Sequence, residues 1–149
     1  AASKLGRLLV ASTERGLCAV QLGESDAALE AALHKDYPRA EIVRDDYAIG
    51  DHTRILPTPG HTPGHVAFTF GRGRDDAVFS GDLMHSPLQA RHPELSAKFD
   101  VDQAQAAATR RGFLERYCDT DTLCCTAHFP SPSTGRIRRA GNGFSCEAL

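Results

Sequence analysis

Short segments that carry histidine or aspartate lie at the ends of three predicted strands. His61 precedes a strand expected over residues 66–70, Asp82 follows one over 77–80, and His128 follows one over 123–126. Loops at strand ends are held by a rigid sheet and remain open to solvent, where reactive groups gather. Two imidazoles and one carboxylate are an ordinary ligand set for Zn²⁺, and Mn²⁺ or Fe²⁺ also accept it. The sequence therefore predicts a metal site at one edge of a sheet.

The composition excludes several other classes of protein. The chain has 149 residues, of which 41% are hydrophobic and 24% charged, so intrinsic disorder is not expected. A net charge of −2 does not favour nucleic acid as a specific partner. No apolar run approaches the ~20 residues of a membrane span. The first residues lack the charged region followed by an apolar region that is typical of a signal peptide. Five cysteines without framework spacing are expected to be reduced thiols, as in a cytoplasmic protein.

The first third of the chain is predicted to be a small αβ segment, residues 1–46. Apolar runs at 8–11 and 17–22 predict a hairpin. Ser25 is expected to cap a helix that runs to about Tyr37. A further strand is expected over residues 40–44.

The composition changes near residues 45–46, and seven of the eight prolines follow this point. The remainder, residues 47–149, is expected to form strands over 53–56, 66–70, 77–80 and 123–126. A long loop over 81–99 precedes a helix capped by Asp100 or Asp102 that ends near Tyr117. A last hairpin, turned at 141–143, is expected to close the sheet. Strands alternating with helices predict a layered α/β (α+β) fold.

Residues 47–149 resemble the C-terminal half of a metallo-β-lactamase-fold hydrolase, of the lactonase and organophosphate-hydrolase branch. The resemblance rests on three blocks in order: TPGHTPGH from Thr58, SGD from Ser80 and AHFP from Ala127. It implies that His61 binds one metal ion, Asp82 bridges two and His128 binds the second. It also implies that these three residues support attack by a metal-bound hydroxide.

The chain departs from that family because the upstream His-x-His-x-Asp-His loop is missing, and the Asp51-His52 pair does not replace it. His61, Asp82 and His128 suffice for one catalytic zinc with an open position. A second ion would need further donors, such as His65, His85, His92 or residues of a partner chain. His85 is the best candidate because it lies three residues beyond Asp82. We therefore expect a metal set of His61, Asp82, His128, His85 and His65, with one or two zinc ions; His65 can alternatively act beside the ligands.

Residues 1–46 resemble the N-terminal lobe of O6-alkylguanine-DNA alkyltransferases of the bacterial Ada type. The resemblance rests on the run from Leu5 to Val20 and the helix that follows it. The family's Pro-Cys-His-Arg nucleophile motif does not occur in the sequence, so alkyl repair is not expected. The chain is interpreted as a chimera of two families.

The resemblance also predicts the assembly. Half of a four-layer αββα sandwich would leave one sheet face bare, so we expect a homodimer that approximates the complete sandwich.

The favoured function is a metal-dependent hydrolase that acts on small phosphoesters, above all phosphodiesters. Arg136, Arg138 and Arg139 form a basic patch that could hold a phosphate. The alternatives are a lactone or carboxylic ester hydrolase, and a zinc-binding remnant without catalysis.

Overall fold

The computed structural model describes residues 2–3, 6–13, 16–43, 48–49 and 51–148. The chain divides into two compact units, residues 1–44 and 45–149. The division lies two residues from the boundary expected from the sequence. No helix among the described residues is long and apolar enough to cross a membrane.

The N-terminal unit contains a three-stranded antiparallel sheet in the order β1-β2-β3 and one helix. Its elements are β1 (Ala2–Ser3), β2 (Gly6–Thr13), β3 (Gly16–Gly23) and α1 (Asp26–Asp36). Ser25 caps α1 by accepting a hydrogen bond from the backbone N–H of Ala28, as the sequence predicts. Arg7 of β2 forms an ion pair with Asp26 at the start of α1. The hairpin and the helix are confirmed.

The strand expected over residues 40–44 is wrong: residues 40–43 have no regular structure, and residue 44 lies outside the described residues. Val43 is 37% exposed, so little apolar burial would stabilise a strand at this place.

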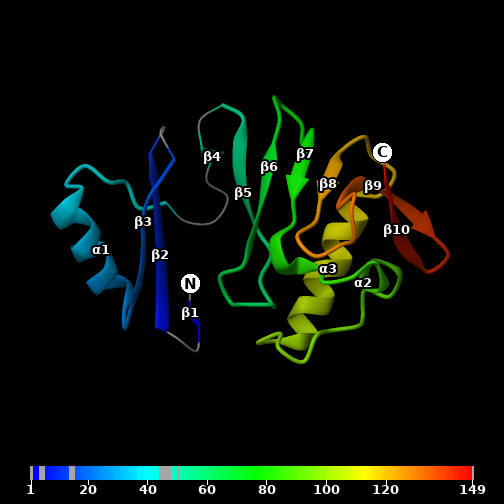
Figure 1. The fold of residues 1–149 in the computed structure, drawn as a ribbon, viewed down its shortest axis with the longest axis horizontal. Coiled ribbons are helices and arrows are strands. Elements are labelled where there is room, and N and C mark those ends of the chain that lie inside the picture. Colours follow the sequence, from blue (N-terminus) through cyan, green and yellow to red (C-terminus); the bar gives the residue numbers. More distant parts are fainter. Residues whose placement is uncertain (1, 4–5, 14–15, 44–47, 50, 149) are drawn as a thin grey trace. The chain divides into compact units, whose positions relative to one another are not determined.

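The C-terminal unit contains a seven-stranded sheet in the order β10-β9-β8-β7-β6-β5-β4 (Figure 1). The strands are β4 (Ala48–Ile49), β5 (Thr53–Pro57), β6 (Val66–Phe70), β7 (Ala77–Phe79), β8 (Leu123–Cys125), β9 (Thr134–Ala140) and β10 (Gly143–Ala148). All neighbours are antiparallel except β7 and β8, which are parallel. The predicted mixed α+β fold is confirmed.

The crossover between β7 and β8 carries the helices η1 (Gly81–Leu83), α2 (Pro87–Arg91) and α3 (Gln103–Tyr117). Residues 81–99, which are expected to be a loop, contain the short helices η1 and α2. Asp102, one of the two predicted caps, accepts a hydrogen bond from the N–H of Gln105 and begins α3.

The core of this unit lies where the helices pack on the sheet. It is made of buried apolar side chains from strands and helices: Ala67, Val78, Leu83, Met84, Ala90, Phe113, Leu114, Tyr117, Cys124, Ile137 and Phe144. Side chains alternate across a strand, so the neighbours of the buried strand residues point to the opposite face. That face carries Phe68, Phe70 and Phe79, which are 38–49% exposed.

Candidate metal centre

The parallel pairing of β7 and β8 brings two of the predicted site residues together. Phe79 of β7 pairs with Cys125 of β8, so both strands end at the same edge of the sheet. Asp82 follows β7 and His128 follows β8, and the Asp82 Oδ1 atom lies 2.8 Å from His128 Nε2. Both side chains are 46% exposed, so the site is open to solvent.

His61 reaches the same edge from the loop between β5 and β6. Its Nε2 atom lies 3.6 Å from Asp82 Oδ2. The loop is held by backbone hydrogen bonds, including Thr58 N–H to His65 O at 2.9 Å and Gly60 N–H to Thr62 O at 3.1 Å. Gly60 is required there because its φ is +134° and a Cβ would lie 2.3 Å from the backbone nitrogen of Ala106.

His85 completes the cluster. Its ring stacks on that of His128 with the centroids 4.9 Å apart, and its centroid lies 5.1 Å from that of His61. The Nδ1 atom of His85 is buried and has no hydrogen-bond partner. Burial, followed by the neighbouring imidazoles, lowers the pKa of His85, which favours the neutral form that binds metals.

Asp82 remains ionised in this setting. Partial burial would by itself raise its pKa, but the hydrogen bond from His128 and the surrounding imidazoles outweigh this and hold the pKa of Asp82 below its ordinary value. A carboxylate charge therefore faces the three imidazoles at neutral pH.

These residues fit a divalent cation. Ligand atoms of Asp82, His85 and His128 all lie within 4.8 Å of one another. Two ligands about 2.0–2.1 Å from a tetrahedral zinc lie about 3.3 Å apart, close to the 3.6 Å between His61 and Asp82. Asp82, His85 and His128 could therefore share one ion, and His61 lies near enough to Asp82 to be a further ligand.

His65, predicted as a further ligand, has both ring nitrogens engaged with the protein. Its Nε2 accepts from the backbone N–H of Asp82 at 2.9 Å, and its Nδ1 faces the hydroxyl and the carbonyl of Thr58 at 2.8 and 3.1 Å. Burial lowers the pKa of His65. In this arrangement His65 anchors the backbone of Asp82 beside the ligands and offers no lone pair to a metal.

Asp100 is a site residue that sequence reasoning missed. Its Oδ1 atom lies 2.9 Å from Nδ1 of His61, and its side chain is fully buried. The sequence analysis considered Asp100 only as a helix cap. Because Asp102 takes that role, the carboxylate of Asp100 is free to face His61.

Other polar candidates lie away from the cluster. His92 is half exposed and faces Glu94. Arg136 and Arg138 donate to the carbonyls of Asp121 and Thr120, which precede β8, so they lie at the opposite end of that strand from His128. Arg139 stacks on the ring of Phe144. These arginines lie on β9 beyond the residues that pair near the site, so the basic patch does not lie beside the proposed metal ligands.

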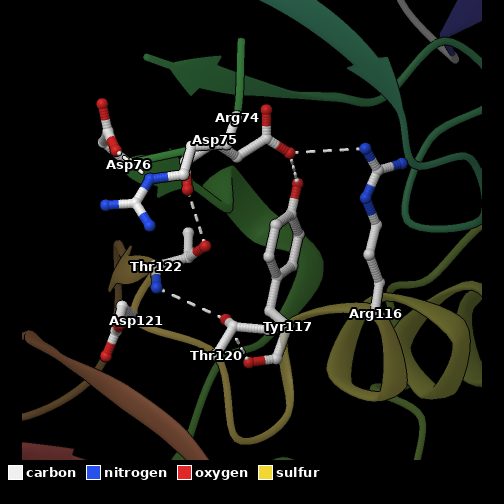
Figure 2. A pocket seen from close by; sticks show the side chains of 8 residues that line it. All are labelled: Arg74, Asp75, Asp76, Arg116, Tyr117, Thr120, Asp121 and Thr122. Carbon is white, nitrogen blue, oxygen red and sulfur yellow. Dashed lines mark hydrogen bonds and ion pairs between the residues drawn. The ribbon is translucent and has the colours of Figure 1, made fainter. Parts of the chain in front are cut away.

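A separate pocket lies where the turn between β6 and β7 meets the end of α3 (Figure 2). Tyr117 donates to Asp75 at 2.7 Å, and Thr122 donates to the Asp75 carbonyl at 2.7 Å. Its lining residues include no histidine, and these contacts fasten α3 and β8 to the turn.

Comparisons with known proteins find two kinds of similarity. Residues 1–54 match the family of the 6-O-methylguanine DNA methyltransferase, ribonuclease-like domain. The bifunctional transcriptional activator/DNA repair enzyme Ada of Escherichia coli (strain K12) is 43% identical over 51 residues, which are 34% of this chain and 14% of Ada.

Solved structures with a similar architecture include a dizinc lactonase and a hydrolase of the β-lactamase superfamily. The dizinc quorum-quenching lactonase AidC superposes with a TM-score of 0.66 at 28% identity, over 83% of this chain and 43% of AidC. The hydrolase AbOPH of the β-lactamase superfamily gives a TM-score of 0.67 at 24% identity, over 79% of this chain and 41% of AbOPH. The two parts of the chain resemble two different families. The first is methyltransferase-like and the second has the metallo-β-lactamase fold, as the sequence predicts.

An N-acyl homoserine lactone hydrolase with its product bound at the catalytic metal centre shares the fold at 18% identity and a TM-score of 0.51.

The chain spans less than half the length of Ada, AidC and AbOPH.

Proposed function

We propose that the C-terminal unit is a metal-dependent hydrolase whose cation, most simply zinc, is held by His61, Asp82, His85 and His128. The observation that carries the proposal is the convergence of one carboxylate and three imidazoles at one solvent-open edge of the sheet. A bound cation supplies a water of lowered pKa and stabilises negative charge on the substrate. The similar solved structures, which are named as hydrolases and lactonases, support this class of reaction.

Each residue of the proposed site has its own role. The imidazoles of His61, His85 and His128 offer nitrogen ligands, while the Asp82 carboxylate supplies charge and an acceptor that can orient a water molecule. His65 keeps the backbone of Asp82 in place. A set of this size is enough for one ion, and a second ion would require donors from elsewhere.

The surroundings favour a lactone or carboxylic ester over the phosphodiester that the sequence analysis preferred. Phe99 is 62% exposed, and its ring centroid lies 4.8 Å from that of His85 and 5.8 Å from that of His61. This ring offers an apolar wall to an uncharged substrate. The basic patch of β9 lies at the far end of β8 from His128, so it is not placed to hold a phosphate beside the proposed metal ion.

The assembly is also a proposal. The exposed phenylalanines of β6 and β7 form an apolar face, which a second copy of the chain would cover in a homodimer. Light scattering measures the solution mass, and a monomer at micromolar concentration would contradict the dimer.

The decisive experiment measures metal and turnover in the same preparation. Chelator-stripped protein, with and without restored Zn²⁺, is assayed on a homoserine lactone, a p-nitrophenyl carboxylic ester and a phosphodiester. We expect about one zinc ion per protomer and metal-dependent hydrolysis of the first two. Zinc binding without turnover of any substrate would support the catalytically inactive remnant, and the lack of zinc binding would refute the metal site.

A further inference from the structure

Asp100 is a fully buried carboxylate directly behind the proposed metal ligands. Its side chain has no exposed surface, whereas that of Asp82 is 46% exposed. A buried carboxylate is retained only where partners satisfy its oxygens. The partners of Asp100 therefore indicate what the residue does.

Each oxygen of Asp100 has its own partners. Oδ1 lies 2.9 Å from Nδ1 of His61. Oδ2 accepts from the backbone N–H of Ala97 at 2.9 Å and lies 3.6 Å from the guanidinium of Arg110. Because Oδ2 is already occupied by donors, the remaining oxygen is the one that faces the imidazole.

Arg110 of α3 contacts both Asp100 and the loop that carries Asp82. It is 1% exposed, and its guanidinium donates to the carbonyls of Leu83, Pro93 and Leu95 at 2.7–2.9 Å. Leu83 directly follows Asp82, so the same guanidinium braces the loop that carries Asp82 and the carboxylate that meets His61. The positive charge also offsets the buried negative charge of Asp100.

We propose that Asp100 is a positioning residue that fixes the tautomer of His61. A carboxylate only accepts hydrogen bonds, so it keeps the proton of a neutral His61 on Nδ1. The lone pair is then on Nε2, the atom that faces Asp82. The consequence for metal binding rests on the proposed function, but the tautomer itself does not.

The Asp100→Asn variant tests this directly. The single amide oxygen would be drawn to the Ala97 N–H and Arg110, which turns the NH₂ group toward His61. An NH₂ donor requires an acceptor at Nδ1, so the proton of His61 moves to Nε2, the atom needed for the metal. The matched control is Asp75→Asn, which alters another carboxylate hydrogen-bonded to a ring side chain, at the separate pocket of Figure 2.

Two measurements follow. ¹⁵N NMR on metal-free protein at alkaline pH, where imidazoles are neutral, should show His61 protonated at Nδ1 in the wild type and at Nε2 in Asp100→Asn. The Zn²⁺ dissociation constant, from competition with a chelating dye, should rise about 10- to 100-fold in Asp100→Asn. Asp75→Asn should leave both unchanged.

A wild-type His61 protonated at Nε2 would overturn the proposal, even if Asp100→Asn did not fold. An unchanged tautomer or an unchanged Zn²⁺ affinity in a folded Asp100→Asn would also overturn it. If the wild type bound no zinc, the proposed function would fail, and the NMR measurement would still decide the role of Asp100.

Discussion

The Nε2 atom of His128 lies 2.8 Å from Oδ1 of Asp82, although 46 positions separate these residues in the chain. The parallel pairing of β7 with β8 is responsible, since each residue follows the end of one of these strands. The carboxylate and the imidazole thus meet without any contribution from a second half of the sandwich.

Removal of the Asp82 carboxylate is expected to abolish metal binding. In Asp82→Ala the three imidazoles lose the charged donor between them, so zinc content should fall toward zero and hydrolysis should stop. His61→Ala and His128→Ala should each lose metal-dependent hydrolysis as well. Elemental analysis after dialysis measures the zinc. His34→Ala, at an exposed position of α1 in the other unit, is the control and should retain both properties. Full activity in Asp82→Ala would refute the proposed site.

Arg110 is expected to be essential for the stability of the C-terminal unit. Arg110→Ala leaves the buried charge of Asp100 uncompensated and takes the Arg110 donor from the carbonyls of Leu83 and Pro93, while the carbonyl of Leu95 still accepts from Gln89 Nε2. The loss should cost about 3–5 kcal/mol of unfolding free energy. Urea denaturation measures the loss. The neighbouring Arg111→Ala removes a solvent-exposed guanidinium that faces Glu94 and Glu115, and should cost at most about 1 kcal/mol. Equal effects of the two variants would contradict this interpretation.

Two glycines should respond to alanine in opposite directions. Gly60→Ala places a Cβ against the backbone of Ala106 at a positive φ, so it should lower the unfolding free energy by about 1–3 kcal/mol through the backbone conformation alone. Gly112→Ala, on the exposed side of α3 with open space around it, should raise the unfolding free energy by about 0.5–1 kcal/mol. Thermal unfolding of both variants provides the measurement. A stabilised Gly60→Ala would show that the loop does not require this glycine.

Alkaline conditions should destabilise the fold through Tyr117. Burial, together with its hydrogen bond to Asp75, raises the pKa of Tyr117 above its ordinary value. The unfolded chain therefore releases this proton near pH 10 while the folded chain keeps it, so stability is full below pH 10 and falls as the pH rises above it. Unfolding free energies between pH 8 and 11 measure the slope. Buried thiols, such as that of Cys124 with its raised pKa, add to the slope, so the comparison with Tyr117→Phe isolates the tyrosine. An unchanged slope in that variant would contradict the assignment.

Local patterns in the sequence were sufficient for most regular elements. Short apolar runs predicted β5 to β8, and Ser25 and Asp102 marked the starts of α1 and α3. The strand expected over residues 40–44 is wrong because a short apolar run forms a strand only where a neighbouring strand can pair with it. The helices η1 and α2 were missed because they are too short to show a helical period.

The sequence by itself indicated that histidines and aspartates would lie at strand ends, and that the two parts of the chain resemble two different families. Only the tertiary structure decided which of those residues meet. It placed Asp100 behind His61, engaged both nitrogens of His65 with the protein, and removed the arginines of β9 from the site. The physical reason is that residue type and spacing fix which lone pairs and charges a chain carries, whereas strand order and side-chain packing fix where they point.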